Sequence, residues 1–512
     1  MTQKNHGDAH QSKRQKTNDD GKSAPKNIIL NAFLMSSPGL QVINSWRNEK
    51  DQTSTSAENP EYWIELAKVL ERGGFNAVFF ADVLGPYDVY KGPGNFKPVA
   101  KAGAQWPLPD PSYYIPLMAA VTKRLAFGIT ISTISEQPYH LARRLGTLDL
   151  ITGGRAGWNI VTSYLDSASR NLLNGQNLPD KVERYKKAEE FVDVIYKLFL
   201  SSWQDGAVKA DKKKGVFTDP EGLRHINHEG KYFNVQGPGL TQPSQQKLPV
   251  IIQAGTSPKG KELAARNAEI IFLNNPSKDS LKKNIDSVKY LAQHKFGRDP
   301  SKIKFLLQVT IIIGDTAEDV KQQIDTVRAL GDDEAALAMF SGWSGIDISA
   351  YTDDKPLEDI ENVAIASTIQ SWKIAYPEVK VWTKKEIIDR VTVSGSGILF
   401  AGTPKEVADT IQDWVEYTGV DGFNFAYTNL PGTFKDIADK LVPELRKRGL
   451  VPGLDELTRA NENGLSFRQQ LFGTNELDPT HPASELKWKS NESRGEFEHR
   501  FSKALEKLHA TL

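Results

Sequence analysis

Cysteine is absent from the 512-residue chain, which excludes thiolate nucleophiles, zinc–thiolate centres and disulfide bonds. Net charge is absent as well, because 64 basic side chains balance 64 acidic ones. A protein whose main partner is nucleic acid needs a basic surface, so that class is disfavoured. The sequence also lacks any run near the ~20 apolar residues that a membrane helix needs. We therefore expect a cytoplasmic protein with no nucleic-acid or membrane partner.

The first 26 residues form a polar leader that lacks the apolar core of a signal peptide. Its composition predicts disorder. The short basic run from Lys13 to Lys16 resembles a nuclear signal. Short basic runs are common in disordered tails, so cytoplasm remains the expected location.

From residue 27 onward, short apolar runs alternate with longer amphipathic stretches. Eight runs are expected to be strands: 27–35, 76–82, 125–133, 156–163, 248–255, 269–274, 304–314 and 422–428. Continuously apolar strands that alternate with helices predict an α/β fold, a (β/α)₈ TIM barrel. The competing fold is an open, doubly wound sheet, which calls for a glycine-rich turn after the first strand. The sequence NAFLMSSPGL lacks that turn, so the barrel is favoured.

The predicted barrel spans residues 27–450 and carries insertions at about 201–247 and 333–395. Residues 451–512 form a C-terminal extension that ends in a helical tail. One face of this tail is apolar, with Phe497, Phe501, Leu505, Leu508 and Leu512 at spacings of three and four. This stripe packs either on its own barrel or on another subunit, and the sequence favours neither.

Active sites of such barrels lie at the C-terminal ends of the strands, so polar residues there are candidates. Asp82 ends the second strand, where it is either a turn cap or a site residue. Thr130 lies in the third strand, where hydroxyl residues are ordinary. Asn159 interrupts an apolar fourth strand, and a buried amide must find partners. Those partners are either backbone groups of the barrel or a ligand.

Gly255, Thr256 and Ser257 follow the fifth strand and stand directly before a helix. The glycine allows close approach of the backbone, the hydroxyls donate, and the start of the helix offers free N–H groups. This combination suits a phosphate group. Alternatively, Ser257 is simply the helix N-cap, with Pro258 at the first helical position. The two interpretations are compatible.

Histidines give weaker signals. His225 and His228 have no accompanying carboxylate cluster, so we expect no metal site. His140 opens a helix near a strand end, where a polar role at the site is one possibility.

Taken together, the chain resembles the bacterial luciferase-like flavin monooxygenases. The similar branch contains nitrilotriacetate monooxygenase component A, dibenzothiophene sulfone monooxygenase and long-chain alkane monooxygenase. The resemblance covers most of residues 27–475 and rests on many segments in the same order. These segments are ERGGFNAVFFADVLGPYDVY, VTKRLAFGITIST, PYHLARRLGTLDLITGGRAGWNIVTS, ERYKKAEEF, PVIIQAGTSPKG and DGFNFAYTNLPGTF.

The resemblance implies a barrel that binds reduced FMN. Asp82 and Thr130 would lie against the flavin ring. Asn159, Ser163 and Tyr164 would line the same pocket. The phosphate and ribityl chain would be held by Tyr185, Ala254, Gly255, Thr256 and Ser257. We assign His140 and Tyr164 as the candidate catalytic residues.

The implied activity is that of a two-component FMN-dependent monooxygenase. Dioxygen is the co-substrate, one of its atoms goes to a small organic substrate, and the other leaves as water. An NAD(P)H-dependent flavin reductase would supply reduced FMN, because the chain shows no nicotinamide fingerprint. A homodimer or homotetramer is expected. We expect the substrate walls to come from residues 36–48, 84–106 and 333–395.

The chain departs from this branch at its histidines. Relatives carry histidines after the first strand, where this chain has Leu40, Ile43 and Asn48. Two further family histidines correspond to Lys181 and Met339 here. The proton donors of the relatives are therefore missing or replaced. Two alternatives follow: a deazaflavin-dependent oxidoreductase of the same fold, and a catalytically silent flavin-binding protein.

Overall fold

The computed structural model describes residues 27–255, 257–360 and 363–510. The leader at 1–26, with its basic run, lies outside the described residues, as do Thr256 and Leu512. Eight strands form the central barrel: β1 (Ile29–Leu34), β2 (Ala77–Phe80), β3 (Ala126–Ser132), β4 (Ala156–Val161), β9 (Val250–Ala254), β10 (Ile270–Leu273), β11 (Lys304–Ile313) and β13 (Gly422–Ala426).

The eight strands close into a ring in which every neighbouring pair is parallel. β1 pairs with β2 on one side and with β13 on the other, and β10 closes the ring by pairing with β11. Parallel strands with helices outside them are buried on both faces, which explains their continuously apolar sequences. The predicted (β/α)₈ TIM barrel is confirmed, and the open doubly wound sheet is excluded.

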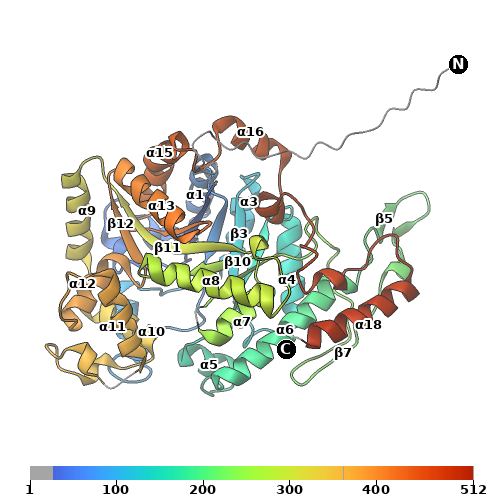
Figure 1. Ribbon diagram of the computed structural model, residues 1–512, viewed down its shortest axis with the longest axis horizontal. Helices are drawn as coiled ribbons and strands as arrows, with labels where there is room; N and C mark the ends of the chain where they lie inside the picture. The colour runs from blue at the N-terminus through green and yellow to red at the C-terminus, as the bar shows by residue number, and fades with distance from the viewer. Residues whose placement is uncertain (1–26, 256, 361–362, 511–512) are drawn as a thin grey trace.

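Helices surround the barrel (Figure 1). Their bounds are α1 (Pro60–Arg72), α2 (Lys97–Ala102), α3 (Ile115–Ala120), α4 (Pro138–Ile151), α5 (Asp166–Leu172), α6 (Lys181–Tyr196), α7 (Pro258–Asn267), α8 (Lys278–His294), α9 (Ala317–Leu330), α10 (Asp333–Ser344), α11 (Val363–Ala375), α12 (Lys384–Ser394), α13 (Pro404–Thr418), α14 (Gly432–Asp436), α15 (Val442–Lys447), α16 (Leu454–Asn463), α17 (Phe467–Phe472) and α18 (Arg494–Ala510). Three of them, α1, α7 and α13, begin at a side-chain cap followed by proline, at Asn59–Pro60, Ser257–Pro258 and Thr403–Pro404. No helix in these described ranges is long and apolar enough to cross a membrane.

One strand was not predicted from the sequence. β12 (Ile398–Gly402) pairs with the second half of β11, from Val309 to Ile313, whereas β10 pairs with the first half. The long strand β11 therefore pairs with β10 along its first half and with β12 along its second half. Before β3, a 3₁₀ turn at Pro111–Tyr113 precedes the short helix α3.

The two insertions lie on opposite flanks of the barrel. Figure 1 shows α10, α11 and α12 grouped on the flank that also carries α9. The polar excursion on the other flank forms two small hairpins: β5 (Val208–Asp211) with β6 (Val216–Thr218), and β7 (His228–Glu229) with β8 (Asn234–Val235). Helix α18 lies on this second flank, near β5.

The apolar stripe of α18 packs on its own chain. Phe497 is fully buried and stacks on Trp488 with ring centroids 5.1 Å apart. The guanidinium of Arg224 lies 4.7 Å from the ring centre of Phe501. Of the two interpretations of this stripe, packing within the chain is therefore the correct one for its described residues.

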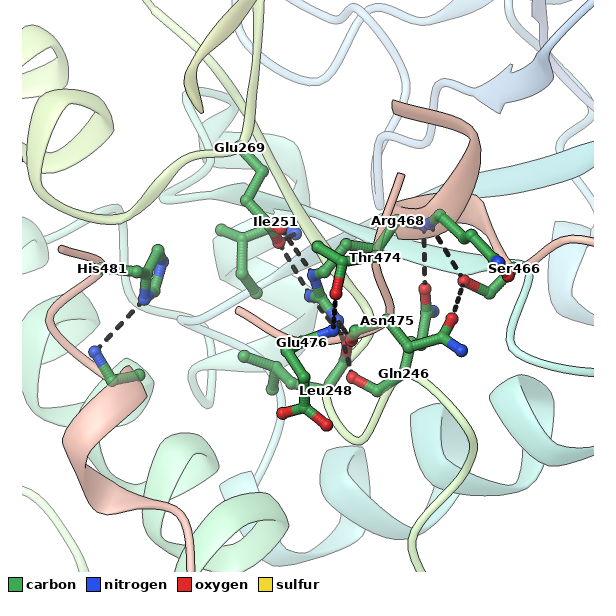
Figure 2. Close-up of polar contacts among 12 residues, drawn as sticks. Gln246, Leu248, Ile251, Glu269, Ser466, Arg468, Thr474, Asn475, Glu476 and His481 are labelled. Carbon is green, nitrogen blue, oxygen red and sulfur yellow. Dashed lines mark hydrogen bonds and ion pairs between the residues drawn. The ribbon is translucent and has the colours of Figure 1, made fainter. Parts of the chain in front are cut away.

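The C-terminal extension also makes polar contacts with residues that precede β9 and β10, as Figure 2 shows. Arg468 on α17 is fully buried, and its guanidinium forms two bonds to the Glu269 carboxylate, of 2.6 and 2.9 Å. It also donates to the carbonyl oxygens of Gln246 and Leu248. Because Glu269 directly precedes β10, this ion pair lies at the opposite end of the barrel from the predicted site.

Candidate active site

The C-terminal ends of the strands surround a cavity of about 310 Å³. Its walls include residues from β1, β2, β3, β4, β9, β10 and β11 or from positions directly after them. Six predicted site residues line it: Asp82, Thr130, Asn159, Tyr164, Ala254 and Gly255. The folded chain therefore brings together residues that are up to 173 positions apart in sequence (Asp82 to Gly255).

A second cavity of about 330 Å³ adjoins the first. Asp82, Thr130 and Tyr164 line both cavities, and Ser163 lines the second. The shared residues therefore stand at the boundary between two adjoining spaces at the barrel mouth. This arrangement provides room for two molecules, or for two parts of one molecule, with Asp82 between them.

Thr130 and Asn159 form a short hydrogen-bonded chain inside the barrel. The Asn159 Nδ2 donates to Thr130 Oγ1 at 2.9 Å, and Thr130 Oγ1 donates to the carbonyl of Phe80 at 2.8 Å. The Asn159 Oδ1 is buried and has no hydrogen-bond partner in the described part of the chain. Buried polar atoms are rarely left unpaired, so this oxygen is available to a ligand N–H.

Asp82 follows β2 directly and carries an altered acidity. Burial, together with the smaller effect of the nearby charge of Asp110, raises the pKa of its carboxyl group to about 7. A backbone hydrogen bond from Val83 and the charge of Arg144 offset only part of this effect. Near neutral pH the group can therefore either donate or accept a hydrogen bond.

Tyr164 belongs to a chain of aromatic hydrogen bonds. Its hydroxyl is bonded to the hydroxyl of Tyr87, which also accepts from the indole N–H of Trp343 at 3.2 Å. Burial raises the pKa of Tyr87 to about 12, so this phenol stays protonated. Half of the Tyr164 surface is exposed. A phenol hydroxyl group thus stands at the boundary of the two cavities.

Ser163 adopts a left-handed backbone conformation with φ of 57°, which is uncommon for a residue other than glycine. Its hydroxyl lies 2.8 Å from that of Ser132, and its carbonyl accepts a hydrogen bond from Arg184 at the start of α6. These contacts hold the turn that carries Tyr164.

The loop after β9 forms a small polar cradle at the start of α7. Gly255 has φ of 145°, which favours glycine. Ser257 is the N-cap of α7, and its hydroxyl accepts from the Gly260 N–H at 3.2 Å. The hydroxyl of Tyr185 lies 3.5 Å from that of Ser257. A Cβ atom at Gly260 would lie 3.1 Å from both oxygens, so glycine keeps the cradle open.

Ser257 is therefore the N-cap of α7. Its second predicted role, in binding a phosphate, is compatible with this geometry and stays a prediction. Thr256, the remaining residue of the predicted loop, lies outside the described residues.

His140 lies apart from these residues. It is exposed on α4 and lines neither cavity, so its catalytic role stays a prediction. His228 of the excursion contacts Glu190 on α6 and Lys197 directly after that helix. No group of three or more potential metal ligands occurs among the described residues.

Sequence reasoning did not single out several lining residues. Tyr87, Gln105 and Trp343 reach the cavity from loops and from α10, as does Gln41. All four come from the segments 36–48, 84–106 and 333–395, which were expected to supply the walls. Their segments were identifiable because they interrupt the strand–helix rhythm, but which side chains point inward depends on tertiary packing.

A closed parallel barrel with convergent polar groups and a carboxylic acid of raised pKa at its mouth has the features of an α/β-barrel enzyme. The family model of the luciferase-like monooxygenases matches residues 40–422. The chain belongs to this family, whose members are oxidoreductases that incorporate oxygen.

Three relatives illustrate the similarity. Dimethyl-sulfide monooxygenase of Hyphomicrobium sulfonivorans is 40% identical, covering 90% of this chain and 94% of the relative. Long-chain alkane monooxygenase of Geobacillus thermodenitrificans strain NG80-2 is 38% identical, covering 88% and 94%. The crystal structure of a riboflavin lyase with modified FMN and riboflavin superposes with a TM-score of 0.80 at 28% identity, covering 90% of this chain and all of that one.

Proposed function

We propose that this protein is the oxygenase component of a two-component monooxygenase. It takes reduced FMN from a separate NAD(P)H-dependent reductase and uses dioxygen to oxygenate a small organic substrate. The observation that carries the proposal is the pairing of the glycine cradle at α7 with the polar cavity at the barrel mouth. Family membership and the named activities of the two monooxygenase relatives support it.

The residues present fit a flavin nucleotide in two respects. The cradle of Gly255, Ser257, Gly260 and Tyr185 offers hydroxyls and a helix N-terminus to a phosphate, and a side chain at Gly260 would crowd it. The unpartnered Asn159 Oδ1 faces a space where the N–H edge of an isoalloxazine ring would find an acceptor.

Bound reduced FMN would supply the two electrons that activate dioxygen. The protein's residues orient the reactants and exclude water. Asp82 and Thr130 lie where the two cavities meet, so they would contact a ring bound at this boundary. The hydroxyl of Tyr164, bonded to Tyr87, is placed to donate a hydrogen bond to the reacting oxygen.

The substrate side of the cavity is largely apolar. Phe33, Phe79, Phe272, Met35 and Leu40 line it. The rings of Phe33 and Phe79 lie 5.2 and 5.3 Å from that of Phe272, so the three form one aromatic wall. Such a wall favours a substrate with an apolar body. We infer a small neutral molecule, such as an organic sulfide or a hydrocarbon.

Replacing Ser257 by alanine tests the phosphate site. We expect Ser257→Ala to weaken FMN binding about tenfold, because a hydrogen bond to a charged group is worth about 1.5–3 kcal/mol. Riboflavin, which lacks the phosphate, should lose little affinity. Calorimetric titration with both ligands measures the difference.

The matched control is Thr403→Ala, which removes a comparable N-cap from α13. It should lower stability by about 1 kcal/mol, as Ser257→Ala does, and leave FMN affinity unchanged. Equal losses for FMN and riboflavin in Ser257→Ala would mean that Ser257 only caps the helix.

The activity itself is tested with ¹⁸O₂, a generic flavin reductase and NADH. Dimethyl sulfide and a medium-length alkane are suitable first substrates. The product should carry one labelled oxygen atom, and omission of the reductase should abolish it. If peroxide is formed without product from every sulfide, amine, sulfone and alkane tried, or if only a deazaflavin supports turnover, the proposal fails.

A further inference from the structure

A third cavity, of about 430 Å³, lies away from the barrel mouth. It is bordered by the C-terminal part of α9, the connection between α11 and α12, α12 itself and β12. Figure 1 shows these helices together on one flank of the barrel. This flank cavity shares no lining residue with the two cavities at the mouth. The proposed FMN and substrate sites therefore do not account for it.

Arg390 lies in the wall of the flank cavity and is 93% buried, with 7% of its surface exposed. Its guanidinium stacks between two aromatic rings, 4.8 Å from the centre of Trp372 and 4.2 Å from that of Tyr376. One amino group donates to the Gly397 carbonyl at 2.8 Å. The structure gives Arg390 no ion pair with an acid among the residues it describes. A buried cation usually has an anionic partner.

Two donors on this wall are unused. The Arg390 Nε–H and the Trp382 Nε1–H are both buried without a hydrogen-bond partner in the described part of the chain, and so is the hydroxyl of Tyr376 beside Arg390. Trp382 is 1% exposed and lines the same cavity. Leaving a buried donor unpaired costs about 1–3 kcal/mol, so two of them beside one cavity indicate a missing acceptor.

Acidic side chains at the rim are engaged elsewhere or exposed. Asp389 forms two hydrogen bonds to Arg328, and Glu386 closes the capping box of α12 with Thr383. Glu378 is exposed to solvent. None of these three acids supplies the acceptor that Arg390 and Trp382 lack.

One part of the cavity wall is apolar, with Val379, Val393 and Leu399 beside the rings of Tyr376 and Trp382, whereas Arg328, Lys385, Ser394 and the three acids form the polar part. A compact inorganic anion would gain nothing from the apolar side chains. A molecule with an aromatic or aliphatic body and one carboxylate would use both parts of the wall. Arginine suits such a group because its donors match the geometry of a carboxylate.

We propose that the flank cavity is a second ligand site, separate from the flavin and substrate sites, that binds a small aromatic or aliphatic monocarboxylate. The carboxylate accepts from Arg390 and Trp382, and the apolar body lies against Val379, Val393 and Leu399. Helix α12, which carries Arg390, connects this site to the mouth cavity. The helix ends at Ser394, and the Ser396 N–H, two residues further on, donates to Gln41 Oε1 at 2.9 Å in the wall of the mouth cavity.

Fluorine NMR of the full chain tests this site. The protein is labelled with 5-fluorotryptophan, and the Trp382 and Trp372 signals are assigned from Trp382→Phe and Trp372→Phe. The probe is 2-naphthoate, with neutral 2-naphthamide as its comparator. We expect naphthoate to shift the Trp382 and Trp372 signals saturably at sub-millimolar concentration, and naphthamide to bind at least tenfold more weakly.

Two variants and one control variant sharpen the test. Trp382→Phe keeps the ring but removes a donor that has no partner within the described protein, so the fold should tolerate it. It should weaken naphthoate binding, followed by the Trp372 signal, about tenfold. Arg390→Gln should remove the preference for naphthoate over naphthamide. Trp343→Phe, in the mouth cavity, should leave naphthoate binding unchanged.

Three results would overturn the proposal. The first is the absence of any shift of Trp382 and Trp372 up to 10 mM naphthoate. The second is a shift confined to Trp343 and Trp106, which line the mouth cavities. The third is equal affinity for the acid and the amide, which would mean that Arg390 does not select the ligand. If Arg390→Gln fails to fold, the acid–amide comparison and Trp382→Phe still decide the outcome.

Discussion

Asp82 combines a predictable position with an unpredictable acidity. Its place at the end of β2 follows from the barrel pattern, because polar residues after parallel strands meet at one end. Its pKa of about 7 depends on burial and on Asp110, which lies 28 positions further along the chain. A single sequence does not show that these two carboxyl groups are neighbours.

We expect Asp82→Asn to stabilise the ligand-free protein in a pH-dependent way. The folded pKa is raised from 3.8 to about 7, so the unfolded chain releases its proton first and the carboxyl group destabilises the fold increasingly between these values. The gain from the variant should grow from pH 5 to pH 7, to roughly 2 kcal/mol after allowance for partial solvent exposure, and stay level above. Urea unfolding at pH 5, 6, 7 and 8 measures it. A gain that does not change with pH would contradict the raised pKa.

Tyr87 and Trp343 show the limit of residue-level reasoning. Both contact the Tyr164 chain, yet one comes from a loop after β2 and the other from an insertion helix 256 positions later. An aromatic residue in an irregular segment is more often simply packed, and no local spacing signals this pairing. Asn159 is the opposite case, since one amide inside an apolar strand is conspicuous in the sequence alone.

At the scale of elements, the helical spacing of apolar residues predicted α18. It also offered packing within the chain as one of two roles for the apolar stripe of that helix. The eight barrel strands were likewise visible as apolar runs. β12 was missed because a run of five residues, two of them glycine or alanine, resembles a loop. Its pairing follows from the length of β11, whose ten residues extend beyond the four-residue β10.

Replacing Phe497 by alanine tests the packing of α18. The ring is fully buried between Trp488 and Phe501, so its removal should lower the free energy of unfolding by about 3 kcal/mol. Leu454→Ala on α16 is the control, because that side chain is 64% exposed and its loss should change stability by less than about 0.5 kcal/mol. Denaturant unfolding monitors both. An effect of Phe497→Ala as small as the control's would mean that the stripe does not hold α18 in place.

For the whole molecule, the two ends of the barrel have different roles: one end carries the cavities, and the other contributes to stability. The C-terminal ends of the strands carry the cavities, whereas the N-terminal ends are contacted by the extension through Arg468 and His481. Burial, together with the charge of Arg298, lowers the pKa of His481 to about 3, so this ring is neutral near pH 7. Its Nε2–H then donates to the Asn267 carbonyl, and its Nδ1 accepts from the Ala483 N–H. The extension therefore contributes to stability at a distance from the chemistry.

We therefore expect Arg468→Met to lower the stability of the fold without changing the affinity for FMN. Burial alone would raise the pKa of Glu269, but its ion pair with Arg468 holds that pKa below the usual 4.5. Without Arg468 a carboxylate is left buried and unpaired, which should lower the free energy of unfolding by about 3–5 kcal/mol at pH 7. The loss of stability should be smaller at pH 5 than at pH 7, because the unpaired buried Glu269 of the variant takes up a proton, whereas the wild-type Glu269, whose pKa lies below 4.5, stays ionised and paired at pH 5.

The double variant Arg468→Met with Glu269→Gln should recover part of this loss, because no charge remains buried. Chemical denaturation at pH 5 and pH 7 gives the stabilities, and calorimetry at a temperature where the variants are folded gives FMN affinity. We expect FMN affinity to stay within twofold of wild type in both variants, since Arg468 lies at the far end of the barrel from the α7 cradle. A loss of FMN affinity in proportion to the loss of stability would show that the two ends of the barrel are energetically coupled, and would contradict their different roles.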